Sequence, residues 1–303
     1  MLHPSPRGAA RLLSGLAAAL LLLGACGDGD DGGDGNGGNG QLPADADPEL
    51  AAMVHEEFRA DGKLVVGVDT TYPPNEYLDT DGQTAVGWDV ELFDAVAAKL
   101  GLTVEWQPAP FGAIIPGVQS GKYEVGVSSF TINEERMAEV NMVSYFNAGT
   151  QWAAPAGSSV DPDNACGLRV AVQRDTVQVE DITARSQACV DAGKEEIVIQ
   201  QYEGQDLATA SVVTGQNDAM LADSPICAYA VQQSNGALEL VGEIYDAAPY
   251  GYVVAKEATE LAEALRAAVQ ALMDDGTYES ILSEWGVQGG GITTSEVNPN
   301  LTS

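Results

Sequence analysis

The chain has 303 residues, of which 45% are hydrophobic, so it can bury one large or two modest cores. Its 45 acidic and 13 basic residues give a formal charge of −32, which repels phosphate backbones and argues against a nucleic-acid partner. The two histidines, His3 and His55, precede the folded region expected below. Ser-His-Asp catalysis, Cys-His catalysis and histidine-ligated metal sites are therefore excluded from that region.

Residues 1–25 have the pattern of a secretory signal peptide. Arg7 and Arg11 precede an apolar run over residues 12–23 that is too short for a permanent transmembrane helix. The run ends in LGAC, so small residues stand directly before Cys26. This pattern resembles a bacterial lipoprotein box, which implies cleavage before Cys26 and lipid attachment to it. The alternative is an ordinary signal peptide followed by an unrelated cysteine.

Residues 26–48 are expected to form a flexible tether. Gly, Asp and Asn make up almost all of Gly27 to Gly40, so this stretch has nothing apolar to bury and its charges repel one another. Its coil reach is roughly 25 Å. A lipid on Cys26 would hold the protein on the outer face of the bacterial cytoplasmic membrane.

After a short helix expected over Pro48–Ala60, strands and helices alternate. Strands are expected over Lys63–Val68, Leu102–Trp106 and Val125–Ser129, with helices over Asp89–Leu100 and Phe111–Ser120 between them. This order predicts a parallel sheet covered by helices.

The pattern loosens over residues 151–157, where the chain is expected to cross to a second lobe with the same alternation. The expected elements there are strands over Arg169–Val172, Ile197–Gln200 and Ala219–Ala222, and helices over Thr176–Ala192, Asp206–Thr214 and Ser224–Ser234. The chain should cross back near Pro249–Val254 and end in helices over Thr259–Asp274 and Thr277–Glu284. The polar tail, residues 288–303, is expected to fray.

Cys166 and Cys189 are expected to form a disulfide inside the second lobe, because exported proteins fold in an oxidising compartment. Closing that loop would stabilise the lobe by about 3 kcal/mol in the chain-entropy model. Cys227, one turn into an apolar helix, is expected to be a buried free thiol. A bridge from Cys227 to either of the others is the alternative.

The stretch over residues 126–136 is the first candidate binding site. An apolar strand ends in the hydroxyl-rich turn Ser128–Thr131, and Asn133 is a good cap for the helix that follows. Free N–H groups and hydroxyls at such a helix start attract an anion, and Arg136 can reach back to grip a carboxylate. The alternative is an ordinary capped helix with a solvated arginine.

Several motifs then follow in order: GVDTTYPP at 67–74, GWDVEL at 87–92, SSFTI at 128–132 with Arg136, DAMLADSP at 218–225, and DGTY at 275–278 before WG at 285–286. Together they resemble the family 3 solute-binding proteins of polar amino-acid ABC transporters, from about Lys63 to Gly286. The resemblance implies a periplasmic-binding-protein-like fold of type II, with two Rossmann-like α/β lobes joined by two hinge strands. With the crossings above, lobe 1 is expected at residues 60–153 and 250–287, and lobe 2 at 154–249.

The resemblance also implies a function. The lobes of such proteins close on one amino acid, and the closed form docks on an ABC permease with its ATPase subunit. A monomer without metal or cofactor is expected. The same fold also hosts dehydratases resembling cyclohexadienyl dehydratase and the sensing domains of receptors. An enzyme would need a general acid over the ligand, a role for Glu76 or another carboxylate, and a receptor would need a transmembrane helix or signalling domain after Gly286.

Carried over by position, the resemblance implies a set of ligand-binding residues: Asp69, Tyr72, Glu76, Phe111, Ser129, Thr131, Arg136, Thr176, Gln178 and Asp223. Arg136, helped by Ser129 and Thr131, would bind the ligand α-carboxylate, and Asp223 would accept from the α-ammonium. Thr176 and Gln178 would complete the carboxylate site from lobe 2.

Tyr72 and Phe111 would stack on the ligand side chain, and Asp69 would contact its distal polar group. The alternative for the aromatic pair is packing. Asp69, Thr176 and Asp223 could instead cap turns or helices.

Two departures from the family pattern bear on the ligand. Asn75-Glu76 stands where an aromatic residue is usual, which predicts a more polar pocket. The second-lobe turn, Gln173–Val177, lacks the usual glycines, and Asp175 aimed at the ligand would repel a carboxylate. Either Asp175 points to solvent, paired with Arg174, or the contact from lobe 2 differs. Asp69 and Glu76 near two aromatic faces suit a cationic side chain, but amide-selective relatives also carry an acid at position 69. A polar or basic L-amino acid is expected, with arginine, lysine or histidine ahead of glutamine.

Overall fold

The computed structural model describes residues 45–301. The expected signal peptide, Cys26 and most of the expected tether lie outside these residues. Within the described part, no helix is both long enough and apolar enough to cross a membrane.

One eight-stranded sheet runs through the fold in the order β5-β1-β6-β11-β7-β10-β8-β9. At one end, β1 (Lys63–Val68) pairs in parallel with β5 (Thr103–Pro108) and β6 (Val125–Gly126). At the other, β8 (Arg169–Gln173) pairs in parallel with β9 (Val198–Tyr202) and β10 (Ala219–Asp223). These two parallel groups, with the helices that cover them, are called lobe 1 and lobe 2 below.

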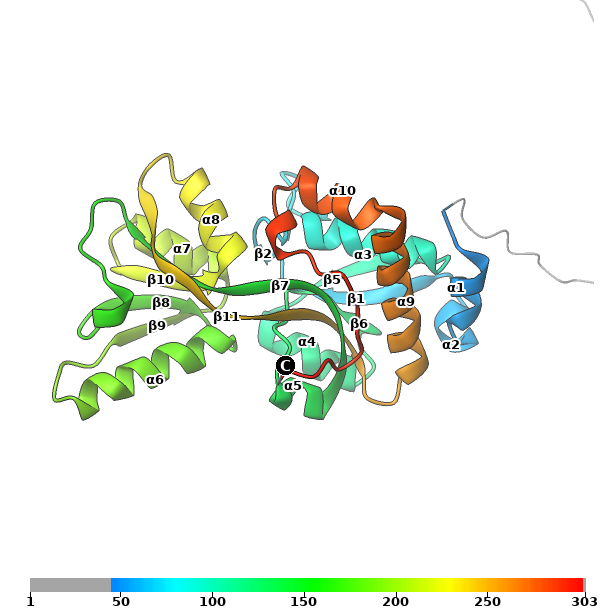
Figure 1. The fold of residues 1–303 in the computed structure, drawn as a ribbon, viewed down its shortest axis with the longest axis horizontal. Coiled ribbons are helices and arrows are strands. Elements are labelled where there is room, and N and C mark those ends of the chain that lie inside the picture. The colour runs from blue at the N-terminus through cyan, green and yellow to red at the C-terminus, as the bar shows by residue number, and fades with distance from the viewer. Residues whose placement is uncertain (1–44, 302–303) are drawn as a thin grey trace, which may run out of the picture. The chain divides into compact units, whose positions relative to one another are not determined.

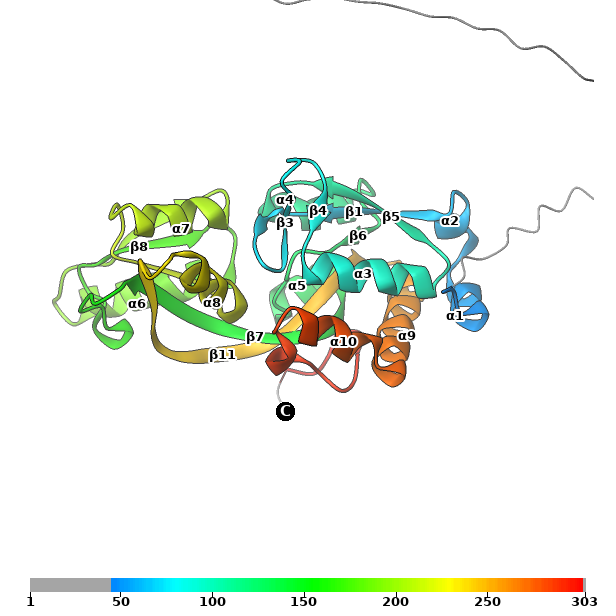
Figure 2. The same cartoon turned by 90° about the horizontal axis from the view of Figure 1, so that it is seen from above.

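Two long antiparallel strands, β7 (Val140–Pro155) and β11 (Leu238–Ala255), connect the lobes. Figures 1 and 2 show them running side by side from one lobe to the other. The predicted fold of two α/β lobes joined by two hinge strands is therefore confirmed. The loosened pattern at residues 151–157 reflects no break in the chain, because β7 continues to Pro155 and residues 152–155 pair in regular register with β11.

Lobe 1 has a hydrophobic core on each face of its sheet, because successive strand residues point to opposite faces. Leu64 and Val66 face α3 (Trp88–Lys99), α9 (Thr259–Asp275) and α10 (Thr277–Glu284), while Val65 faces α4 (Phe111–Gln119). Helix α5 (Glu134–Glu139) follows the hydroxyl-rich turn. The helix expected over Pro48–Ala60 is two short helices, α1 (Pro48–Met53) and α2 (Glu56–Arg59), because the backbone is extended at Val54 and His55. A small sheet of β2 (Thr71–Tyr72), β3 (Glu76–Leu78) and β4 (Ala85–Val86) extends the loop after β1.

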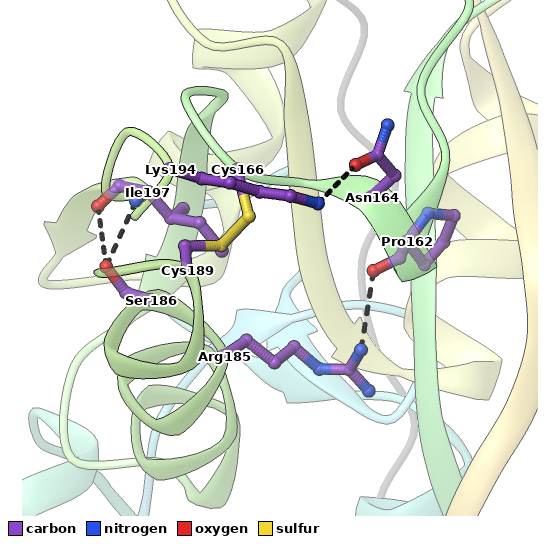
Figure 3. Close-up of a disulfide and its surroundings, with 8 residues drawn as sticks. All are labelled: Pro162, Asn164, Cys166, Arg185, Ser186, Cys189, Lys194 and Ile197. Atoms are coloured by element: carbon purple, nitrogen blue, oxygen red, sulfur yellow. Dashed lines mark hydrogen bonds between the residues drawn. A yellow bond between two sulfur atoms is a disulfide. The ribbon is translucent and has the colours of Figure 1, made fainter. Parts of the chain in front are cut away.

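Lobe 2 repeats this arrangement. Val170 and Val172 pack with Ile182 of α6 (Val177–Asp191), while Ala171 packs with residues of α7 (Gln205–Val213) and α8 (Ser224–Gln233). A short 3-10 helix, η1 (Pro162–Asn164), precedes β8. Cys166 and Cys189 form the predicted disulfide, which joins the segment before β8 to the last turn of α6 (Figure 3). Cys227 is the predicted buried free thiol.

Over residues 288–301, the part of the tail that the structure describes, the chain packs against β7, contrary to the prediction that it frays. After η2 (Gln288–Gly290), Val297 pairs with Val143, and the Ser295 hydroxyl, buried in the structure, donates to the Ser144 carbonyl at 2.7 Å. The tail packs there because one edge of β7 has no partner strand in lobe 1. The β7 segment in lobe 1 pairs with β11 on one side only, so its other side offers unpaired backbone groups to the tail.

Candidate functional site

A cavity between the lobes collects side chains from both. Lobe 1 contributes Asp69, Tyr72, Phe111, Ser128, Ser129, Thr131 and Arg136, and lobe 2 contributes Gln173, Thr176, Val177, Gln178 and Asp223. Most follow the carboxyl ends of parallel strands or begin helices, which is where open α/β sheets place ligands. Every predicted ligand-binding residue except Glu76 lines this cavity.

Arg136 supplies the cavity's positive charge. Asn133 caps α5 as predicted, its Oδ1 accepting from the Arg136 backbone N–H at 2.8 Å. The Arg136 guanidinium donates to the Thr131 carbonyl at 2.8 Å and lies 5.3 Å from the Phe111 ring centroid. Burial lowers the pKa of Arg136. Within residues 45–301 no carboxylate forms an ion pair with it, although six other arginines and lysines are so paired. The guanidinium therefore remains available to an anion.

Asp223 is the acid on the opposite lobe. Its carboxylate is 5% exposed and accepts hydrogen bonds from Tyr72 Oη at 2.9 Å, Tyr250 Oη at 2.7 Å and Gln178 Nε2 at 2.8 Å. Burial raises its pKa, while these hydrogen bonds and the Arg136 charge act in the opposite direction. Its side chain makes no capping bond to α8, so the capping alternative does not describe it. No base in the described part of the chain pairs with it.

Asp69 is a second buried acid in the cavity wall. One carboxylate oxygen accepts from the Thr71 N–H at 3.1 Å and hydroxyl at 2.8 Å, so the turn-capping alternative holds for that oxygen. The other accepts from Gln173 Nε2 at 2.7 Å, across the lobes, and from the Phe111 N–H at 3.1 Å. Burial raises the pKa of Asp69 despite these donors.

The aromatic and hydroxyl residues have mixed roles. The Tyr72 hydroxyl joins the lobes through Asp223, and Phe111 stacks on Phe130 with centroids 4.6 Å apart. The rings of Tyr72 and Phe111 also line the cavity, so packing does not account for these two residues completely. Thr176 begins α6 without capping it, because its hydroxyl donates to the Gln173 carbonyl at 2.8 Å.

Glu76 does not line the cavity, and its prediction as a ligand-contacting residue is corrected. It is completely buried beneath the serine turn, where it accepts from Ser129 Oγ at 3.0 Å and Ser128 Oγ at 3.3 Å. Asn75 lies in the same layer, between the indole N–H of Trp88 and Ser129 Oγ. A buried acid requires donors, and the serine hydroxyls provide them on the side away from the ligand. The polar pair at 75–76 therefore supports the pocket and does not make its lining more polar.

Asp175 also points away from the cavity. Its backbone is left-handed, with φ 64°, and its carbonyl accepts from Arg136 Nη2 at 3.3 Å across the lobes. The side chain lies against α4, since a Cβ added to Gly112 would be 2.2 Å from Asp175 Oδ2. Asp175 is exposed, as the first alternative has it, but Arg174 pairs with Glu203 at 2.7 Å and not with Asp175. Asp175 is not among the residues that line the cavity.

Three lining residues were absent from the set of ligand-binding residues that the resemblance implied: Ser128, Gln173 and Val177. Ser128 did belong to the hydroxyl-rich turn that the sequence marked as a candidate site. Gln173 had the clearest signal, because it ends a strand at the same sheet edge as Asp223. Its cross-lobe bond to Asp69 depends on how the lobes meet, which strand pattern alone does not predict.

Comparisons with known proteins agree with the two-lobed fold and identify the family. Residues 64–288 match the bacterial extracellular solute-binding proteins, family 3. The arginine-binding protein ArgT of Corynebacterium glutamicum is 40% identical over 261 residues, which cover 85% of each protein. A solved ancestral arginine-binding protein bound to arginine has a TM-score of 0.69 at 32% identity, covering 74% of this chain and 98% of that one. An ancestral amino acid-binding protein, AncCDT-1, described as a precursor of cyclohexadienyl dehydratase, has a TM-score of 0.66 at 29% identity, covering 76% and 98%. The chain therefore belongs to the bacterial extracellular solute-binding proteins of family 3.

Proposed function

We propose that this protein captures a basic L-amino acid, arginine first, between its two lobes. The observation that carries the proposal is the pair of opposite charges on the two sides of the cavity, Arg136 in lobe 1 and Asp223 in lobe 2, neither of which forms an ion pair within residues 45–301. A zwitterion that leaves water needs an opposite charge at each end. Arg136 would take the α-carboxylate with two parallel hydrogen bonds, helped by Ser129 and Thr131, and Asp223 would accept from the α-ammonium.

The charge balance of the cavity favours a cationic side chain. Arg136 contributes one positive charge, whereas Asp69 and Asp223 contribute two negative charges when ionised. A neutral amino acid would leave one buried negative charge uncompensated, and a basic one would neutralise it. The rings of Tyr72 and Phe111 would add cation–π contact with a guanidinium. Similarity to an arginine-binding protein at 40% identity supports arginine over lysine, histidine or glutamine.

The ligand would also favour lobe closure. Lobe 1 would hold one end of the amino acid and lobe 2 the other, so the ligand binds the closed arrangement more tightly than an open one. We infer that the closed form delivers the amino acid to an ABC permease and its ATPase subunit. A lipid on Cys26 would anchor the protein, as a monomer, to the extracytoplasmic face of the membrane.

Binding without chemistry is part of the proposal. A dehydratase would need a general acid over the ligand, a role for Glu76 or another carboxylate, and Glu76 lies beneath the serine turn. Turnover of prephenate or arogenate by the purified protein would contradict this part of the proposal.

A thermal-shift panel of amino acids tests the function. L-Arginine at a hundredfold excess over its dissociation constant is expected to stabilise the protein by about 2.7 kcal/mol. Lysine, histidine and glutamine should act more weakly, and aspartate and glutamate not at all. A panel in which only the acidic amino acids raise the melting temperature would contradict the proposal.

A further inference from the structure

Two buried carboxyl groups lie together behind the serine turn that lines the cavity. Glu76 of β3 and Asp89 of α3 are both 0% exposed. Glu76 accepts from both serine hydroxyls, and Asp89 Oδ2 accepts from the Ser129 N–H at 3.3 Å and from Tyr145 Oη at 2.6 Å. Ser128 and Ser129 line the cavity, so the two acids hold a wall of the ligand site without contacting its interior.

No positive charge compensates this pair. Within residues 45–301 neither acid forms an ion pair with a lysine, arginine or histidine. The titratable groups that face them from neighbouring elements are acids or phenols: Asp69 after β1, Tyr145 on β7, and Tyr250 and Tyr252 on β11. Two ionised carboxylates at such a site would be strongly unfavourable. Burial raises the pKa of Asp89 to about 7 and raises that of Glu76 well above its usual range.

One carboxyl oxygen of this pair also lacks a hydrogen-bond donor. Asp89 Oδ1 is buried and has no hydrogen-bond partner among the described residues. Glu76 lies close enough to Asp89 for the two carboxyl charges to interact, and both acids accept a hydrogen bond from Ser129. A hydrogen bond between two carboxyl groups requires a proton on one of them, because an ionised carboxylate only accepts. A proton on Glu76 would supply it.

We propose that Glu76 and Asp89 share one proton, and that this shared proton keeps the serine turn in the geometry that binds the ligand. Ser129 has φ 51°, a left-handed conformation that a residue with a Cβ adopts only when its surroundings hold it there. The holding contacts are its N–H to Asp89, its hydroxyl to Glu76 and the Asn75 amide to its Oγ. When the proton leaves to water, two adjacent carboxylates repel each other and these contacts weaken. Glu76 is then a positioning residue that acts on the ligand through Ser128 and Ser129. The effect on ligand binding rests on the proposed function, whereas the shared proton does not depend on it.

Glu76→Gln separates the proton from the rest of the site. Glutamine can donate to Asp89 through its amide nitrogen and accept from a serine hydroxyl through its oxygen, but it cannot ionise. Because glutamine has one acceptor oxygen where Glu76 has two, it keeps one of the two serine hydrogen bonds. Between the unfolded carboxyl pKa, about 4.3, and the raised folded pKa, the native wild type holds one more proton than the unfolded chain. The contribution of this proton to the free energy of unfolding is therefore present at acidic pH and is lost as pH rises through that window.

Chemical denaturation between pH 5 and 7, without ligand, measures this loss. The wild-type unfolding equilibrium constant is expected to rise, relative to that of Glu76→Gln, about tenfold per pH unit. Glu257→Gln, at an exposed surface position, is the matched control and should follow the wild type. Parallel pH dependence of wild type and Glu76→Gln would overturn the inference.

Calorimetric titration with L-arginine between pH 6 and 8.5 tests the effect on binding. Wild-type affinity is expected to fall as pH rises, by up to tenfold per pH unit, while Glu76→Gln keeps a flatter profile in the same buffers. Titration of the ligand is common to both proteins and cancels. Equal profiles would overturn the positioning role. No arginine binding at any pH would contradict the proposed function, and the denaturation result would then decide whether the proton is shared.

If Glu76→Gln does not fold, infrared spectra of the wild type test the shared proton instead. A protonated-carboxyl band at pH 6 that weakens by pH 9 supports the shared proton, and the absence of this band at pH 6 overturns it.

Discussion

Three charged residues, Arg136, Asp69 and Asp223, line the cavity, and the base is held by a different kind of contact from the two acids. Arg136 is positioned by a backbone carbonyl and aromatic faces, which leave its charge without a partner. Asp223 and Asp69 are held by neutral donors, which orient a carboxylate without cancelling its charge. At this scale the site consists of fixed charges that a ligand must complement.

Asp223→Asn tests the ammonium end. The substitution keeps the size of the side chain but removes the charge, so arginine affinity should fall about 30-fold or more, a loss of roughly 2 kcal/mol or more for a buried charge pair. Titration calorimetry measures the change. Asp218→Asn is the control and should leave affinity unchanged, because Asp218 directly precedes β10 and pairs with Arg169 at the surface. Unchanged affinity in Asp223→Asn would remove Asp223 from the site.

At acidic pH, binding of arginine should weaken as pH falls, in the opposite direction to the loss expected above pH 6 from Glu76 and Asp89. Burial raises the pKa of both Asp69 and Asp223, and the ionised carboxylate is the form that attracts a cation, so protonation removes the attraction. Each group contributes at most about tenfold per pH unit below its pKa in the free protein. Titrations of wild type and Asp69→Asn between pH 4.5 and 7 should show a shallower acid limb in the variant. Identical acid limbs would mean that Asp69 does not meet the ligand's charge.

At the scale of helices and strands, the predictions based on short stretches of sequence were mostly correct. Asn133 caps α5, Cys166 reaches Cys189, and the helix over Thr277–Glu284 has the predicted bounds. The predictions that failed depend on partners distant in the sequence. Glu76 was assigned to the ligand because no local pattern shows that serines 52 and 53 positions later will bind it. The tail was expected to fray because its composition does not reveal the open edge of β7.

Removal of residues 288–303 tests the packing of the tail. The truncated protein loses the Ser295 and Asn298 hydrogen bonds to β7, so its unfolding free energy should fall by about 1–3 kcal/mol and its melting temperature by a few degrees. Arginine affinity should change little, because no tail residue lines the cavity. Deletion of residues 302–303 alone is the control. An unchanged melting temperature after the larger deletion would contradict the role of the tail.

At the scale of the whole molecule, the site depends on the meeting of the two lobes. Tyr72 to Asp223, Gln173 to Asp69 and Arg136 to the Asp175 carbonyl are all hydrogen bonds between lobes. The sequence motifs predicted which strand ends carry cavity-lining residues, because each motif lies on one element. They did not predict Gln173 or the orientation of Asp175, since both follow from the contact of one lobe with the other.

The central claim is that one amino acid spans the charges of both lobes, and a cycle of two proteins and two ligands tests it most directly. Calorimetry would compare L-arginine with agmatine, which lacks the α-carboxylate, on the wild type and on Arg136→Ala. The wild type is expected to bind agmatine about 30-fold or more weakly than arginine, whereas Arg136→Ala, with an unchanged melting temperature in the absence of ligand, should scarcely distinguish the two. If the two losses simply add, or if the wild type binds both ligands equally well, Arg136 does not hold the carboxylate and the account is contradicted.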